Sequence, residues 1–138
     1  MVRSGYLYPM PDVIVNKQQF YNPVDYVLKK IGGTWKIPVL WRLQKKARRY
    51  SELQKDIPHI SQKMLTQTLK ELEADGFISK QTFPEVPPRT EYSLTPKGQQ
   101  AMEVIVVIRN YGLQLLQADG IDYEAMIKAE AEQKKKQS

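Results

Sequence analysis

Apolar residues follow a helical period in the first third of the chain. The pair Asn22-Pro23 is typical of a helix start, and apolar residues then fall at i, i+3, i+4 and i+7 through Ile31. Gly32-Gly33 is expected to end this helix. Thr34 is expected to cap a second helix that runs to Leu43.

Two further helices are predicted to meet across a tight turn. Ser51 is expected to cap a short helix that Ile57-Pro58 ends. After the turn at residues 58–60, Ser61 is expected to cap a long helix that runs to Asp75. One side of the long helix carries leucines at i, i+4 and i+7, namely Leu65, Leu69 and Leu72. This order predicts a helix-turn-helix.

Aromatic and β-branched residues then replace the helical pattern. Residues 77–83 and 90–94 are predicted to form the strands of a hairpin, because prolines between them prevent either strand from continuing. Thr95-Pro96 is expected to open a helix to about Gln117. Its run at residues 104–108 is apolar around nearly the whole circumference, so we expect another surface to cover it.

The predicted fold is therefore mainly α with a small β-hairpin wing, a winged helix-turn-helix. We divide it into an irregular N-terminal arm (1–21), a DNA-binding domain with its dimerisation helix (22–117), and a C-terminal helix with a frayed basic tail (118–138). The two terminal helices are expected to form a symmetric homodimer interface. The residues assigned to that interface are Ile105, Ile108, Leu113, Leu116 and Met126.

The positive charge is concentrated in one part of the chain. The formal net charge is +6, and eight basic residues but no acid lie between Tyr26 and Tyr50. A segment of this kind attracts a polyanion such as double-stranded DNA, because neutralised phosphates release their condensed counterions. A solvated, lysine-rich helix face would give the same count.

Candidate DNA contacts lie on the long helix, before it and on the wing. Long polar side chains share one face of the helix, opposite its leucines, and suit the edges of bases in a major groove. The prolines of the wing loop would present Arg89 to a minor groove, unless Arg89 pairs with Glu85 or Glu91 and merely closes the hairpin. The complete set of candidates is Arg48, Arg49, Ser61, Gln62, Lys63, Thr66, Gln67, Lys70 and Arg89.

Several classes of function are excluded or disfavoured by residue content. The chain has no cysteine and one histidine, His59, which removes thiol nucleophiles, disulfides and cysteine-ligated zinc. We expect no catalytic activity, no cofactor and no metal. With no signal peptide and no long apolar stretch, a cytoplasmic protein without membrane contact is expected. Any small-molecule effector would act through a pocket or through the DNA itself.

An ordered series of motifs covers about residues 22–116: Gly32-Gly33-Thr34-Trp35, Tyr50-Ser51-Glu52-Leu53, Ile60-Ser61-Gln62-Lys63-Met64-Leu65-Thr66, Leu69 to Gly76, and Glu85 to Thr95 with Val86-Pro87-Pro88-Arg89. This series resembles the HxlR-type winged helix-turn-helix regulators, relatives of the MarR group. The resemblance implies a dimeric bacterial transcription regulator that binds inverted-repeat operators. It also implies that the helix after Ser61 enters the major groove and the wing arginine the minor groove.

Two positions depart from the family pattern. Many members carry a cysteine before the proline that opens the first helix, and this chain has Asn22 there. Thiol sensing is therefore not carried over. The family's usual lysine after the Gly-Gly pair is Thr34 here, so a DNA-backbone contact from that position is not carried over either.

Two other functions make different predictions. A winged helix used only for protein–protein contact would show no salt-dependent binding to DNA. A small enzyme would need a nucleophile with a base, a phosphate loop or a metal cluster, and the sequence offers none of these patterns.

Overall fold

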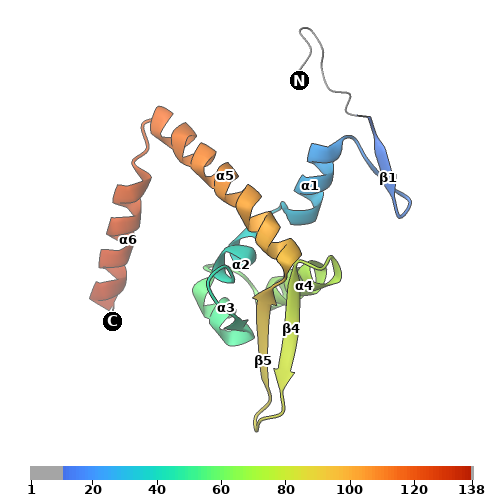
Figure 1. The fold of residues 1–138 in the computed structure, drawn as a ribbon. Helices are drawn as coiled ribbons and strands as arrows, with labels where there is room; N and C mark the ends of the chain where they lie inside the picture. Colours follow the sequence, from blue (N-terminus) through green and yellow to red (C-terminus); the bar gives the residue numbers. More distant parts are fainter. Residues whose placement is uncertain (1–10, 138) are drawn as a thin grey trace. The chain divides into compact units, whose positions relative to one another are not determined.

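The computed structural model describes residues 11–137 (Figure 1). Its helices in this range are α1 (Pro23–Ile31), α2 (Lys36–Arg42), α3 (Tyr50–Asp56), α4 (Gln62–Ala74), α5 (Pro96–Ala118) and α6 (Tyr123–Gln137). Its strands are β1 (Val13–Val15), β2 (Gln18–Phe20), β3 (Arg48–Arg49), β4 (Ile78–Phe83) and β5 (Arg89–Leu94). The order of helices and the hairpin confirm the winged helix-turn-helix prediction.

The chain divides into two compact units within α5. The first ends at Ala101 and the second begins at Met102. The second unit therefore holds the remainder of α5 and all of α6, whereas the sequence placed a boundary near residue 117. None of the helices in the described range is both long and apolar enough to cross a membrane.

The helix-turn-helix consists of α3, the turn after it and α4. Ile57 ends α3, and His59 adopts a positive φ of 67° in the turn. Ser61 then caps α4, as predicted, because its Oγ accepts a hydrogen bond from the Met64 backbone N–H at 3.0 Å. The predicted apolar face of α4 is buried, with Leu65, Leu69 and Leu72 all in the core. Gly76 follows the helix at φ 79°, a conformation that glycine adopts without a steric penalty.

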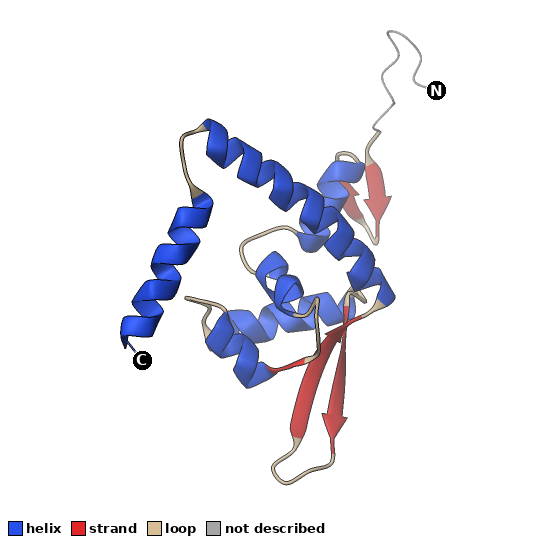
Figure 2. Cartoon of the chain, turned by 60° about the vertical axis from the view of Figure 1, so that its left-hand side comes forward, coloured by secondary structure: helices blue, strands red, loops and turns tan. Residues whose placement is uncertain are grey.

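The wing is a three-stranded antiparallel sheet in the order β3-β5-β4 (Figure 2). Strands β4 and β5 pair from Ile78↔Leu94 at the base to Phe83↔Arg89 next to the loop. The predicted hairpin is thus confirmed. The sequence did not reveal β3, because its two residues, which pair with Tyr92 and Glu91, are too few to show a strand period.

The first helix begins as the sequence predicted. The Asn22 Oδ1 accepts a hydrogen bond from the Asp25 N–H at 2.8 Å, and Asp25 Oδ2 accepts one from the Tyr21 N–H at 2.9 Å. The hydrogen bond from Tyr21, reinforced by Lys29, lowers the pKa of Asp25 below its ordinary value. The two reciprocal bonds therefore fix the start of α1 with a charged carboxylate.

Part of the predicted irregular arm is a β-hairpin. Residues 13–20 form β1 and β2, joined at Asn16 and Lys17, which have φ values of 51° and 65°. Two consecutive positive φ values define the tight turn that suits a two-residue hairpin loop, and a lysine gives no signal for it. Phe20 at the end of β2 is buried and meets Tyr26 edge to face, with ring centroids 4.6 Å apart. Residues 1–10 of the predicted arm lie outside the described residues.

Three other local predictions need correction. Thr34 does not cap α2, which begins after Trp35 without a side-chain cap. Ser51 lies inside α3, because the chain leaves β3 in extended conformation at Arg49 and the helix starts directly afterwards. The Arg49 N–H is satisfied by Glu52 Oε1 at 3.0 Å. Residues 134–136, expected to be frayed, belong to α6.

Candidate nucleic-acid interface

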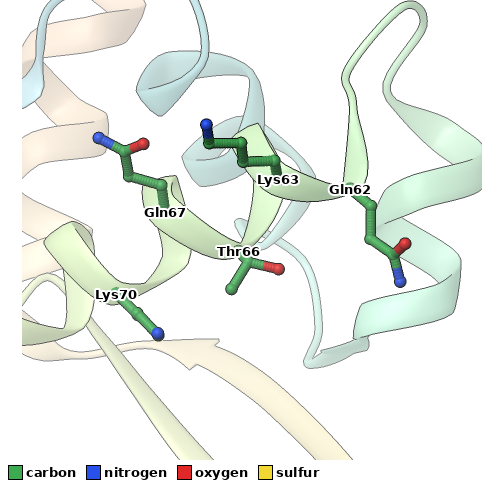
Figure 3. A pocket seen from close by; sticks show the side chains of 5 residues that line it. All are labelled: Gln62, Lys63, Thr66, Gln67 and Lys70. Carbon is green, nitrogen blue, oxygen red and sulfur yellow. The ribbon is translucent and has the colours of Figure 1, made fainter.

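The exposed face of α4 carries the polar side chains that the sequence singled out. Gln62, Lys63, Thr66, Gln67 and Lys70 are all exposed and line one shallow depression. Figure 3 shows these five side chains standing out from the α4 ribbon. Since the leucines on the opposite side are buried, α4 is held by one face and leaves the other open to a partner. Ser61 lies at its N-terminal end, where its hydroxyl serves as the cap.

The acidic end of α4 is paired with lysines of other elements. Lys36 Nζ lies 3.5 Å from Glu71 Oε2, and Lys30 Nζ lies 3.4 Å from Asp75 Oδ1. Gln67 Nε2 donates to the other Glu71 oxygen at 3.2 Å. These contacts offset two of the negative charges that would repel a phosphate backbone from this helix.

Several basic residues between Tyr26 and Tyr50 are engaged in contacts within the protein. In addition to Lys30 and Lys36, Arg42 donates hydrogen bonds to the carbonyl oxygens of Pro38 and Asp56 at 3.4 and 3.1 Å. Much of this local positive charge therefore holds helices together. Lys45, Lys46 and Arg49 remain exposed.

The two candidate DNA contacts in β3, Arg48 and Arg49, differ in their surroundings. Arg48 Nε donates to the Arg42 carbonyl oxygen at 3.3 Å, and its Nη1 lies 3.8 Å from Glu52 and 3.9 Å from Asp56. Its side chain is only 24% exposed. Arg49 points from the same strand to the opposite side, as the alternation of a β-strand requires, and is exposed. The structure therefore does not present Arg48 and Arg49 as an equivalent pair.

Arg89 stands at the tip of the wing in contact with both flanking acids. Its Nη2 lies 3.6 Å from Glu85 Oε1 and its Nε lies 3.6 Å from Glu91 Oε1. The guanidinium also stacks on Phe83, with Cζ 4.1 Å from the ring centroid. This is the alternative in which Arg89 closes the hairpin, although 27% of its side chain stays exposed.

The comparisons with known proteins agree with this geometry. The model of the HxlR-like helix-turn-helix family matches residues 30–120. The chain belongs to the HxlR-like helix-turn-helix family. An HTH-type transcriptional regulator of Methanothermobacter thermautotrophicus is 44% identical over 89 residues, which cover 64% of this chain and 68% of that protein.

Two solved structures are also similar to this HxlR-like chain. A MarR-family transcriptional regulator from Porphyromonas gingivalis W83 is 41% identical, with a TM-score of 0.62 over 66% of this chain and 89% of that one. The redox regulator HypR in its oxidized form is 36% identical, with a TM-score of 0.63 over 67% of this chain and 95% of that one.

Sequence reasoning missed one residue of the HxlR-like interface, Tyr50. Its hydroxyl lies 3.0 Å from the Gln62 carbonyl oxygen and 2.9 Å from Thr66 Oγ1. Tyr50 thus joins the start of α3 to the first turns of α4. Tyr50 opens one of the family motifs, Tyr50-Ser51-Glu52-Leu53, but the motif does not show which residue the hydroxyl meets, so only the tertiary structure reveals this contact.

A neighbouring tyrosine of the wing has a different environment. Burial raises the pKa of Tyr92, and the nearby Glu73 and Tyr50 raise it further. Tyr92 therefore stays a neutral phenol in β5, where it pairs in register with Arg48. Among the described residues, no group of three or more acidic, histidine or cysteine side chains could hold a metal.

The predicted dimer residues of α5 and α6 divide into two groups. Ile105 is only 2% exposed within the single chain, so it offers little surface to a second chain. Ile108 and Met126 are exposed to 45% and 57%, while Leu113 and Leu116 are partly exposed. Other large apolar side chains of the second unit are also exposed: Val104, Val106, Val107, Tyr111, Leu115, Ile121, Tyr123 and Ile127.

Proposed function

We propose that this HxlR-like protein is a transcriptional regulator that binds a pseudo-palindromic DNA operator as a homodimer. The observation that carries the proposal is the open face of α4. Its polar side chains are exposed together, while Glu71 and Asp75 are paired with lysines. The regulators to which the chain is similar support the same function.

We assign the contacts according to the chemistry of each side chain. Gln62, Thr66 and Gln67 offer donors and acceptors of the kind that read base edges in a major groove. Lys63 and Lys70 flank them on α4 and are suited to phosphates. Arg49 adds a phosphate contact beside the helix.

Two residues take less direct roles in this proposal. Arg48 positions β3 through the contacts that its guanidinium makes with the backbone and with Glu52. Arg89 enters the minor groove from the wing. To do so, its guanidinium must give up its ion pair with Glu85 or Glu91 and contact the DNA instead. The charge on the wing is therefore held close to acids before DNA binds.

The exposed apolar surface of the second unit supports the homodimer. So many large apolar side chains exposed on two helices indicate a site of association. A second copy of the chain is its simplest occupant, since a twofold axis matches a pseudo-palindromic operator. We assign the interface to Ile108, Leu113, Leu116 and Met126, together with the exposed valines of α5. Ile105 does not belong to it.

A salt titration separates this function from a winged helix used only for protein contact. The affinity of the full-length protein for duplex DNA is measured between about 50 and 200 mM salt. A DNA-binding regulator gives a linear log–log plot with a slope near −0.9 times the number of neutralised phosphates. A flat plot, or no binding at the lower salt concentration, contradicts the proposal and favours the protein-contact alternative.

A further inference from the structure

The hydroxyl of Tyr50 reaches the open face of α4 from the start of α3. It lies within hydrogen-bond distance of two oxygens, the Gln62 carbonyl at 3.0 Å and Thr66 Oγ1 at 2.9 Å. Thr66 is itself exposed on the face that we assign to base reading. The direction in which the Thr66 hydroxyl forms hydrogen bonds therefore depends on Tyr50.

The direction of these two hydrogen bonds follows from proton counting. A tyrosine hydroxyl has one proton, and a backbone carbonyl oxygen can only accept. The contact with Gln62 is therefore a hydrogen bond only if Tyr50 donates its proton there. Thr66 must then donate its own proton to the Tyr50 oxygen, because two oxygens at 2.9 Å need a proton between them.

This direction determines what Thr66 can offer to DNA. A free threonine hydroxyl can donate or accept, and so does not distinguish an amino group from a carbonyl on a base edge. Once its proton is committed to Tyr50, only the lone pairs of Thr66 Oγ1 remain for a partner. In the major groove, the groups that donate to such an oxygen are the exocyclic amines, N6 of adenine and N4 of cytosine.

We propose that Tyr50 is a positioning residue that makes Thr66 an obligate hydrogen-bond acceptor, so that Thr66 selects an exocyclic base amine in the operator. The inference rests on the proposed function, since it assigns a specificity to the same α4 face. Tyr50 reaches this specificity without touching DNA. A hydrogen bond of ordinary strength corresponds to about a fivefold change in affinity.

The test exchanges one group on the DNA and removes one group from the protein. An operator is first selected from random duplexes by the full-length wild-type protein, and the position read by Thr66 is found as the one where Thr66→Val loses preference. At this position adenine paired with thymine is replaced by hypoxanthine paired with cytosine, or cytosine paired with guanine by uracil paired with adenine, so that a carbonyl oxygen stands where the amine was. We expect the wild type to lose about fivefold in affinity.

The variants must then respond differently to the same DNA. Tyr50→Phe keeps the ring and frees the Thr66 proton, so its hydroxyl can donate to the carbonyl and the exchange should cost it less than twofold. Thr66→Val should also be insensitive, and Thr66→Ser should behave as the wild type does. The double variant should match Thr66→Val. Tyr26→Phe, which removes a hydroxyl from a ring packed on Phe20, is the matched control and should keep the wild-type response.

Two results would overturn the proposal. The first is a Tyr50→Phe variant that loses as much affinity as the wild type when the amine is replaced by a carbonyl. The second is a wild-type protein that binds the carbonyl-bearing operator as tightly as the amine-bearing one. Failure of the proposed function looks different, because the wild-type protein would then enrich no operator at all. Melting curves of each variant verify that the fold is retained.

Discussion

Arg89 lies directly opposite Phe83 in the register of the wing, and its guanidinium carbon is 4.1 Å from the centre of the Phe83 ring. Glu85 and Glu91 approach the same guanidinium from two sides at 3.6 Å. The arrangement stiffens the tip of the wing and holds its charge near two acids. DNA must compete with these acids for Arg89.

Neutralising the acids should therefore strengthen DNA binding. Glu85→Gln keeps the shape of the side chain but removes a competitor for Arg89, so we expect an increase of about twofold or more in operator affinity. Arg89→Ala should weaken specific binding by about 1–3 kcal/mol. Fluorescence anisotropy with a labelled operator measures both. Unchanged affinity in both variants would show that the wing charge is not used.

Substitution of Arg49 should weaken DNA binding, whereas substitution of Arg48 should lower the stability of the fold. Arg49→Ala removes an exposed charge, so it should lower affinity for all duplexes and reduce the salt slope by about 1, with little effect on the melting temperature. Arg48→Ala removes the hydrogen bond to the Arg42 carbonyl and two ion pairs, and should lower the melting temperature. The paired measurements are salt titrations and thermal melts. The reverse pattern would contradict the assignment.

Because the chain has no cysteine, we expect thiol oxidants to have no effect on its DNA binding. A chain without thiols forms neither disulfides nor thiol adducts. Diamide, or hydrogen peroxide at doses that spare methionine, should leave operator affinity unchanged, whereas the similar protein HypR is a redox regulator. Gel-shift assays with and without oxidant measure this directly. Loss of binding under diamide alone would show that another oxidisable group controls the protein.

The proposed homodimer is best tested by a substitution on α5. Met102 and Ile105 are buried within the chain, so truncation before them would damage the fold itself. Val107 is 67% exposed, and Val107→Glu would place an unpaired charge in the proposed interface, at a cost of about 3 kcal/mol or more. We expect this variant to sediment as a monomer at micromolar concentration and to bind the operator poorly.

A matched control places the same charge elsewhere on the helix. Gln99→Glu adds a carboxylate at an exposed position near the start of α5 and should leave self-association unchanged. A wild-type protein that is monomeric at micromolar concentration would contradict the homodimer. A Val107→Glu variant that still dimerises would move the interface to another surface.

The sequence predicted helix starts and buried faces correctly where the local signals and the packing agree. The cap at Ser61, the leucines of α4 and the start of α5 at Pro96 all lie where they were predicted. In each case a residue with a strong positional preference stands beside an apolar pattern that matches the buried face. The open face of α4 followed from the same pattern, because side chains opposite buried leucines must be exposed.

Contacts between distant segments were not predictable in this way. The hairpin turn at Asn16 and Lys17 has a lysine where glycine would signal a positive φ. Lys36 and Glu71 are far apart in the sequence, so their pairing could not be inferred from the charge of either segment. The apolar run of α5 correctly predicted that apolar side chains would remain exposed on the single chain. It did not show that Ile105 is buried.

The most direct test of the central claim is selection of bound sequences from a pool of random duplexes by the full-length protein. A homodimer with α4 in the major groove should enrich an inverted repeat whose half-sites are centred about 10 base pairs apart, one turn of the double helix. Replacing the enriched bases in both half-sites by other bases should abolish specific binding. Enrichment of no sequence, or of a single half-site without a symmetric partner, would contradict the account of this protein as a dimeric operator-binding regulator.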